Sequence, residues 1–198
     1  MKRTLVLAIV IVAMIAFAAC GKKDDPSKKS EGVMTYAQYD AAAIDAEVVI
    51  ECYVQATQSW WDNKITVYGA DPDGAYFIYN MTCTEEDSKK LVPGTKIKVT
   101  GYKTEWSGEI EVKEGATFVI EEGSYKATAK DVTSLLGKDE LIKYQNRFVS
   151  FKNVEIAASQ DADGNSVPWL YKYNGSGQEG DDLYFKVLVD GKEYTFTV

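Results

Sequence analysis

Aromatic side chains are the first residues in this sequence whose type and spacing suggest a function. Trp60, Trp61 and Trp106 lie between segments that alternate apolar and polar residues. Such rings stack on sugar faces, bases or apolar peptide side chains, with large contact area for little lost rotamer entropy. Tyrosines in the neighbouring segments extend this candidate ligand-binding set: Tyr68, Tyr79 and Tyr102. The alternative is that the rings pack against the body of the folded protein and cover its apolar interior as hydrophobic lids.

Catalytic chemistry is restricted by one absence. Histidine does not occur in the 198 residues, which excludes Ser-His-Asp and Cys-His catalysis and His-ligated metal sites. Glu105, Glu109 and Glu111 have the side chains for paired-carboxylate glycoside hydrolysis. Their alternation along one strand instead predicts a charged outer face, so we expect no catalytic residues and no enzyme activity.

A metal or cofactor site is not predicted either. Residues 161–165 resemble the start of a calcium loop. An EF-hand needs Gly at its sixth position and Glu at its twelfth, where this chain has Ser166 and Lys172. We expect a solvated turn there, no metal and no cofactor.

The charge balance argues against nucleic acid as a partner. Lys and Arg number 22 against 30 Asp and Glu, a formal net charge of −8. Proteins that bind nucleic acids draw most of their nonspecific affinity from Lys and Arg at phosphates. No basic stripe offsets the acidic balance.

The first twenty residues have the pattern of an export signal. Lys2 and Arg3 precede an apolar run over residues 5–17, which ends in Ala18, Ala19 and Cys20. The run is shorter than a membrane-spanning helix needs, and basic residues before it with small residues after it are typical of a signal peptide. The ending resembles the lipobox of bacterial lipoproteins, which implies a signal peptide over residues 1–19 and a lipid on Cys20. The alternative is an ordinary signal peptide with an incidental cysteine.

The lipobox resemblance implies a protein outside the cytoplasmic membrane, anchored to the bacterial cell membrane through its lipid. Residues 20–33 then form the lipidated cysteine and a flexible linker, because residues 21–33 are polar and charged with no apolar periodicity. Lys28 and Lys29 belong to this expected solvated spacer.

The rest of the chain predicts an all-β protein with short helices. Period-two alternation or β-rich composition marks strands at residues 48–56, 64–68, 76–81, 96–101 and 109–112. Turn chemistry at residues 71–74 separates two of these strands. A cap-like Thr84 with an acidic residue three positions later predicts a helix that ends at Leu91.

Three strands, a helix and two strands is the element order of the OB-fold, a five-stranded Greek-key barrel. The segments VVIECYVQA, AYFIYN and LVPGTKIKVTGY resemble those of bacterial OB-fold lipoprotein domains of unassigned function, and place the domain at residues 34–128. OB-folds bind ligands across strands two and three, between the loops that join strands one to two and four to five. We expect these two loops, with their tryptophans, to meet at one rim of the barrel.

Residues 129–198 resemble a second, incomplete copy. Residues 134–147 predict a short helical segment and residues 148–156 a first strand. Residues 183–189 and 192–198 flank Asp190-Gly191, a strong hairpin signal. The chain stops before the remaining strands, which favours a longer natural chain over a half-barrel packed on the first domain. The aromatic stretch at residues 169–173 has the same two interpretations as the tryptophans.

Cys52 and Cys83 remain after Cys20 is assigned to the lipid. Cys52 lies on the apolar side of its strand and is interpreted as a small core residue. A bridge between the pair stays open, since exported proteins form disulfides.

These patterns lead to one functional hypothesis and one alternative. The first is a noncatalytic, membrane-tethered module that binds an oligosaccharide or peptide on the OB-fold loop face. The second is a structural or protein-interaction lipoprotein of the cell envelope, whose aromatic residues dock a protein or cap the barrel.

Overall fold

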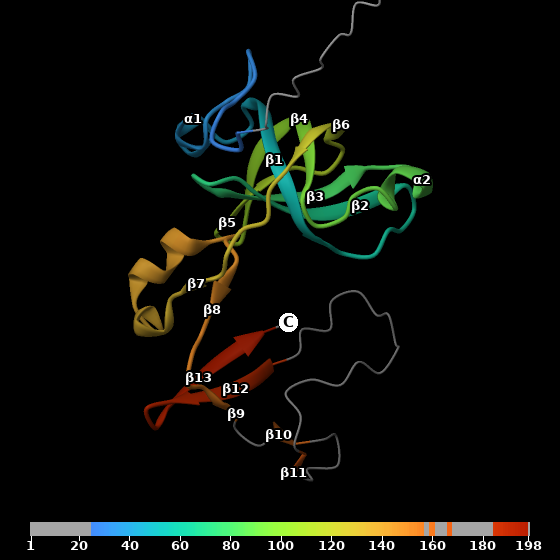
Figure 1. The fold of residues 1–198 in the computed structure, drawn as a ribbon. Coiled ribbons are helices and arrows are strands. Elements are labelled where there is room, and N and C mark those ends of the chain that lie inside the picture. Colours follow the sequence, from blue (N-terminus) through green and yellow to red (C-terminus); the bar gives the residue numbers. More distant parts are fainter. Residues whose placement is uncertain (1–24, 157–158, 161–165, 168–183, 198) are drawn as a thin grey trace, which may run out of the picture.

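The computed structural model describes residues 25–156, 159–160, 166–167 and 184–197. A β-barrel forms the first part and a smaller sheet the second (Figure 1). The predicted signal peptide and Cys20 lie outside the described residues. Within the described part, no helix has the length and apolar character to cross a membrane.

Five strands close the barrel. In chain order these elements are β1 (Glu47–Thr57), β2 (Lys64–Ala70), β3 (Ala75–Thr82), helix α2 (Glu85–Ser88), β4 (Thr95–Trp106) and β5 (Glu109–Val112). Neighbours in the sheet run β1-β2-β3-β5-β4, and β4 pairs again with β1. Only the β3–β5 pair among them is parallel. This is the predicted all-β OB-fold barrel, and it confirms the element order derived from the sequence.

The alternating residues of the strands fill the barrel interior. On β1 the alternation predicts five inward apolar positions, and four of them are buried: Val48, Ile50, Cys52 and Val54. The fifth, Ala56, is exposed near the end of the strand. Cys52 is a core residue, as predicted, and Cys83 also joins the core. Both thiols are free in the structure, so the alternative of a bridge between them is not realised here.

Two glycines of the LVPGTKIKVTGY segment have different physical roles. Gly94 adopts φ +105°, a backbone region that glycine enters without steric cost. Gly101 lies where β4 changes its neighbour from β6 (Thr117–Ser124) to β5. A Cβ at Gly101 would lie 2.7 Å from Val112 Cγ1, so only glycine lets the two strands approach.

Two elements of the first domain were not predicted. One is β6, which extends the sheet along the first half of β4. The other is helix α1 (Tyr36–Ala41), which begins with a capping box between Thr35 and Gln38. The buried Lys103 ammonium donates to three carbonyl oxygens around the end of α1, those of Tyr39, Asp40 and Ala42, at 2.7–3.1 Å.

The segment before α1 is docked on the barrel, which corrects the expected linker. Lys29 is 8% exposed and its ammonium lies 2.5 Å from the Asp71 carboxylate, which is 1% exposed. Lys29 also donates to the Glu51 carbonyl oxygen at 2.7 Å. Met34 forms a parallel bridge with Ile50 of β1. The composition of residues 21–33 hides this docking, because one buried lysine in a polar stretch has no distinguishing pattern.

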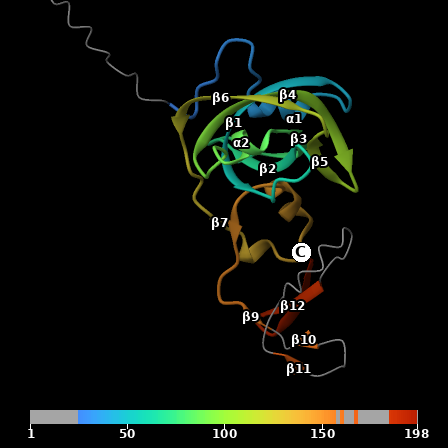
Figure 2. The same cartoon turned by 90° about the vertical axis from the view of Figure 1, so that its right-hand side faces the viewer.

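The C-terminal part begins with a parallel pair, β7 (Lys130–Asp131) and β8 (Val149–Ser150). Two 3₁₀ helices, Thr133–Leu135 and Asp139–Tyr144, lie between them where a helical segment was predicted. Figure 2 shows the chain around β7 on one side of the ring of barrel strands. A three-stranded antiparallel sheet follows, made of β9 (Glu155–Ile156), β12 (Tyr184–Val189) and β13 (Lys192–Thr197), besides the short pair β10 (Ser159–Gln160) and β11 (Ser166–Val167).

One prediction for this part is confirmed and one is wrong. Asp190 and Gly191 both have positive φ and connect β12 to β13, as the hairpin signal predicts. The single strand expected at residues 148–156 is instead divided into β8 and β9. Asn153 between them adopts φ +54°, and this left-handed residue ends the extended chain.

We predict that Lys29→Ala destabilises the barrel strongly. Removing the ammonium leaves the buried Asp71 carboxylate without its ion-pair partner, and breaking one side of a buried pair costs about 3–5 kcal/mol. Urea denaturation followed by circular dichroism measures the loss in unfolding free energy. The matched control is Lys28→Ala, because the Lys28 side chain is 81% exposed beside Asp25. Equal effects of the two substitutions would contradict the docked position of Lys29.

Candidate functional site

The registers of four strands align a polar and aromatic row on the outside of the barrel. Tyr68 of β2 pairs with Phe77 of β3, and Phe77 pairs with Glu111 of β5. Glu111 in turn pairs with Thr104 of β4. Directly paired residues point to the same side of a sheet. Their chain neighbours Val67, Ile78 and Val112 point into the core, so this row faces outward.

Aromatic rings continue this outer surface along the strands. The Tyr68 and Phe77 ring centroids are 5.1 Å apart, and those of Phe77 and Tyr79 are 6.3 Å apart with an interplanar angle of 27°. In the next row Trp106 pairs with Glu109. We call the surface formed by Tyr68, Phe77, Tyr79, Thr104, Trp106, Glu109 and Glu111 the aromatic–acidic face.

Two carboxyl groups in this face are held in an unfavourable environment for charge. Glu111 is 8% exposed, and burial raises its pKa above the ordinary value, with a smaller contribution from the Glu109 carboxylate. Burial also raises the pKa of Glu109. Carboxylates of this kind accept hydrogen bonds from hydroxyl donors, while the neighbouring rings supply stacking surface. The arrangement is suited to a ligand with polar edges and apolar faces.

The tryptophan loops do not meet, which corrects the expectation of a common rim. The β3–β5 register places Glu109, and with it the β4–β5 turn, beside the start of β3 at Ala75. The β1–β2 turn lies beside the end of β3, since Lys64 pairs with Thr82. The two turns are therefore about 23 Å apart at about 3.3 Å per strand residue. In Figure 1 α2, which follows β3, is at the right of the barrel and β5 at the left.

The three tryptophans accordingly have three different environments. Trp106 is 74% exposed on the aromatic–acidic face, and Trp61 is 67% exposed at the opposite end of β3. Trp60 packs against the core, and its indole Nε1 donates to the Cys83 carbonyl oxygen at 2.9 Å. For Trp60 the lid interpretation is correct, because its polar atom is satisfied within the fold.

The tyrosines of the candidate set are placed more favourably. Tyr68 and Tyr79 are half-buried members of the face. Tyr102 is exposed on β4, two residues before Thr104 and therefore on the same side of the strand. Four of the six predicted residues thus share one side of the sheet, and Trp60 and Trp61 are separate from them.

Two members of the face, Phe77 and Glu111, were not among the predicted binding residues. Phe77 follows the alternation of AYFIYN with Tyr79, so the period-two pattern contained a signal for it. Glu111 was assigned to a solvated outer face together with Glu105 and Glu109, but it is buried. The burial of Glu111 follows from the register of β5 against β3 and β4. The local sequence pattern of β5 does not predict that register.

The chain after β6 covers one margin of the face. The Gln145 side chain accepts from the Ile110 N–H at 2.9 Å and donates to the Gly108 carbonyl oxygen at 2.7 Å. The Asn146 side chain donates to the Ile110 carbonyl oxygen at 2.9 Å. The β4–β5 turn, and with it Trp106, is thereby fixed to the segment that follows the 3₁₀ helices.

Other candidates from the sequence contribute nothing to this site. Residues 161–165, the calcium-like loop, and the aromatic stretch at 169–173 lie outside the described residues. Across the described ranges, no group of three or more His, Cys, Asp and Glu is placed to hold a metal ion.

Comparisons with known proteins do not assign this chain to a family. No protein-family model matches the chain, and no curated protein matches it. Among solved structures, it is similar to asparaginyl-tRNA synthetase from Entamoeba histolytica in complex with asparaginyl-adenylate, with 14% identity and a TM-score of 0.36. That match covers 55% of this chain and 29% of the synthetase chain. The OB-fold architecture rests on the strand order and registers described above.

We predict that Glu111→Gln stabilises the protein at neutral pH. The folded state raises the pKa of Glu111 above its ordinary 4.5, so folding carries a penalty when the carboxyl is ionised. The penalty is present above the folded-state pKa and disappears below the unfolded one, where both states are protonated. The gain in urea-unfolding free energy should therefore be largest near pH 7 and vanish on acidification below about pH 4. Glu105→Gln, at an exposed position in the same hairpin, serves as the control; a pH-independent gain for Glu111→Gln would contradict the assignment.

Proposed function

We infer that this protein is a noncatalytic binding module that holds an oligosaccharide on the aromatic–acidic face. The observation that carries the proposal is the alignment of Tyr68, Phe77 and Glu111 in one row across three strands. Sugar rings have apolar faces that stack on aromatic side chains and hydroxyl edges that donate to carboxylates. Both complements occur on this surface within neighbouring residues.

The energetic cost of Glu111 supports a binding role. A carboxyl group whose pKa is raised by burial opposes folding at neutral pH, and an apolar or amide side chain at this position would avoid the cost. Groups that are unfavourable for stability cluster at functional sites. The exposed Trp106 beside it is a large apolar surface that the fold itself does not use.

The N-terminal sequence supports a location for this module. Residues 1–19 have the composition of a signal peptide and end at a lipobox-like Cys20. The proposal is that the barrel is presented outside the cytoplasmic membrane, anchored by a lipid on that cysteine. A neutral or cationic glycan suits the acidic chain better than nucleic acid, because the net charge is −8.

The test is binding of the full chain to a glycan array, repeated with Trp106→Ala and Tyr79→Ala. We expect glycan hits for the unmodified protein and a loss of about tenfold or more in affinity for either variant, the size of one aromatic contact in a binding site. Trp61→Ala is the matched control, since Trp61 has almost the same exposure as Trp106 but lies at the other end of β3.

Two outcomes would overturn the proposal. An array without hits would favour the alternative, an envelope protein whose surface aromatics dock another protein. Hits that are weakened by Trp61→Ala and unaffected by Trp106→Ala would move the binding site away from the aromatic–acidic face.

A further inference from the structure

A hollow lies next to the aromatic–acidic face, between the outer surface of β1 and β2 and two chain segments that cross it. Its volume is about 490 Å³, within the range of about 300–1,000 Å³ that holds small ligands. One wall is the segment 125–127, by which the chain leaves the barrel. The other is the segment 146–148, by which it returns. We call this hollow the crossing groove.

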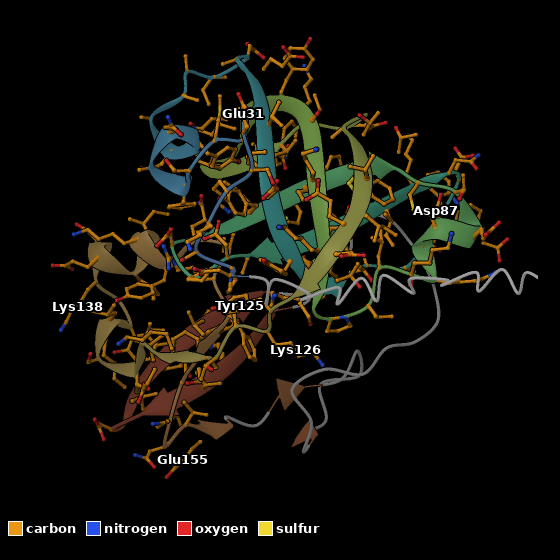
Figure 3. The ribbon with its side chains drawn as sticks, turned by 45° about the horizontal axis from the view of Figure 1, so that its top comes forward. Glu31, Asp87, Tyr125, Lys126, Lys138 and Glu155 are labelled. Atoms are coloured by element: carbon orange, nitrogen blue, oxygen red, sulfur yellow. The ribbon has the colours of Figure 1, made fainter. Side chains whose placement is uncertain are left out.

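Both walls are fastened to the barrel by hydrogen bonds. Gln55 of β1 donates through Nε2 to the Tyr125 carbonyl oxygen at 3.2 Å and accepts from the Ala127 N–H at 2.8 Å. On the opposite wall, Arg147 donates to the Asp73 carbonyl oxygen and lies 5.4 Å from the centre of the Tyr36 ring. The groove is therefore formed before any ligand enters. Figure 3 labels Tyr125 and Lys126 on the side of the barrel toward the C-terminal part.

The lining combines flat apolar surfaces with positive charge. Tyr68 and Phe148 contribute rings, and Phe148 is 58% exposed. Lys126 and Arg147 contribute cations, and among the described residues that line the groove none is Asp or Glu. In a chain of net charge −8, a surface hollow with two cations and no carboxylate is a local reversal of sign. Low-dielectric walls around such a hollow concentrate the field that attracts an anion.

We propose that the crossing groove binds a small organic anion with a flat ring, of the aromatic carboxylate or sulfonate class. The ring lies between Tyr68 and Phe148, and the anionic group meets Lys126 and the free donors of Arg147. Arg has five N–H donors, so its bond to Asp73 leaves others for the ligand. This site adjoins the aromatic–acidic face and shares Tyr68 with it. Its cations, Lys126 and Arg147, and its second ring, Phe148, do not belong to that face, so the site does not depend on the proposed glycan function.

The test uses two fluorescent probes that share one ring system. 8-Anilinonaphthalene-1-sulfonate carries the anion, and N-phenyl-1-naphthylamine is the same body without the sulfonate. Titrated into the full chain, the sulfonate should bind more tightly, and its affinity should fall as salt rises. Lys126→Glu should weaken sulfonate binding about tenfold, the size of one charge-assisted hydrogen bond, and leave the neutral probe unchanged. Phe148→Ala should weaken both probes.

Two controls separate this site from the rest of the molecule. Lys113→Glu makes the same charge change at an exposed residue beyond β5 and should not alter sulfonate binding. Trp106→Ala removes a ring from the aromatic–acidic face and should leave both probes unaffected, so that failure here and failure of the glycan proposal are distinguishable. Equal affinity for the two probes, or sulfonate binding unchanged by Lys126→Glu, would overturn the proposal.

Discussion

The pairing of β1 with β4 is the interaction on which the barrel depends. Seven consecutive residues of β1, from Glu47 to Tyr53, pair with Lys96 to Tyr102 in reverse order. Without this ladder the sheet would be open, and both β1 and β4 would present unpaired edges. Closure also fixes the direction of β4 beyond Gly101, where it turns to pair with β5. The order of side chains on the outer surface of β3, β5 and β4 therefore depends on the β1–β4 ladder elsewhere in the barrel.

The sequence predicts this architecture well because the barrel is made of local patterns. Alternation identifies β1, and turn residues at 71–74 and the LVPGTKIKVTGY segment delimit the strands that follow. The same reasoning misses β6 and the docked Lys29. The first lacks a clean alternation, since Val119 and Ile120 are adjacent and both exposed. The second depends on a partner 42 residues away, and no local pattern records such a pair.

The candidate site is harder to predict than the fold for a geometric reason. Residue types alone point to aromatic side chains, and Tyr68, Tyr79, Tyr102 and Trp106 share one side of the sheet. Trp60 and Trp61 were grouped with them because loops one-two and four-five were expected to converge. The parallel register of β3 and β5 decides this question. A shift in that pairing by two residues would keep every burial pattern and yet move Trp106 along the face.

The docking of Lys29 also sets the freedom of the whole molecule at a surface. Residues from Asp25 onward belong to the described structure, and the Lys28 N–H donates to the Asp25 carbonyl oxygen. If Cys20 carries a lipid, only the five residue steps from Cys20 to Asp25 separate the bilayer from the folded body, a reach of at most about 17 Å. A connection this short would restrict tumbling and keep one flank of the protein turned toward the headgroups. Ligands would then have to reach the protein from the side that faces away from the bilayer.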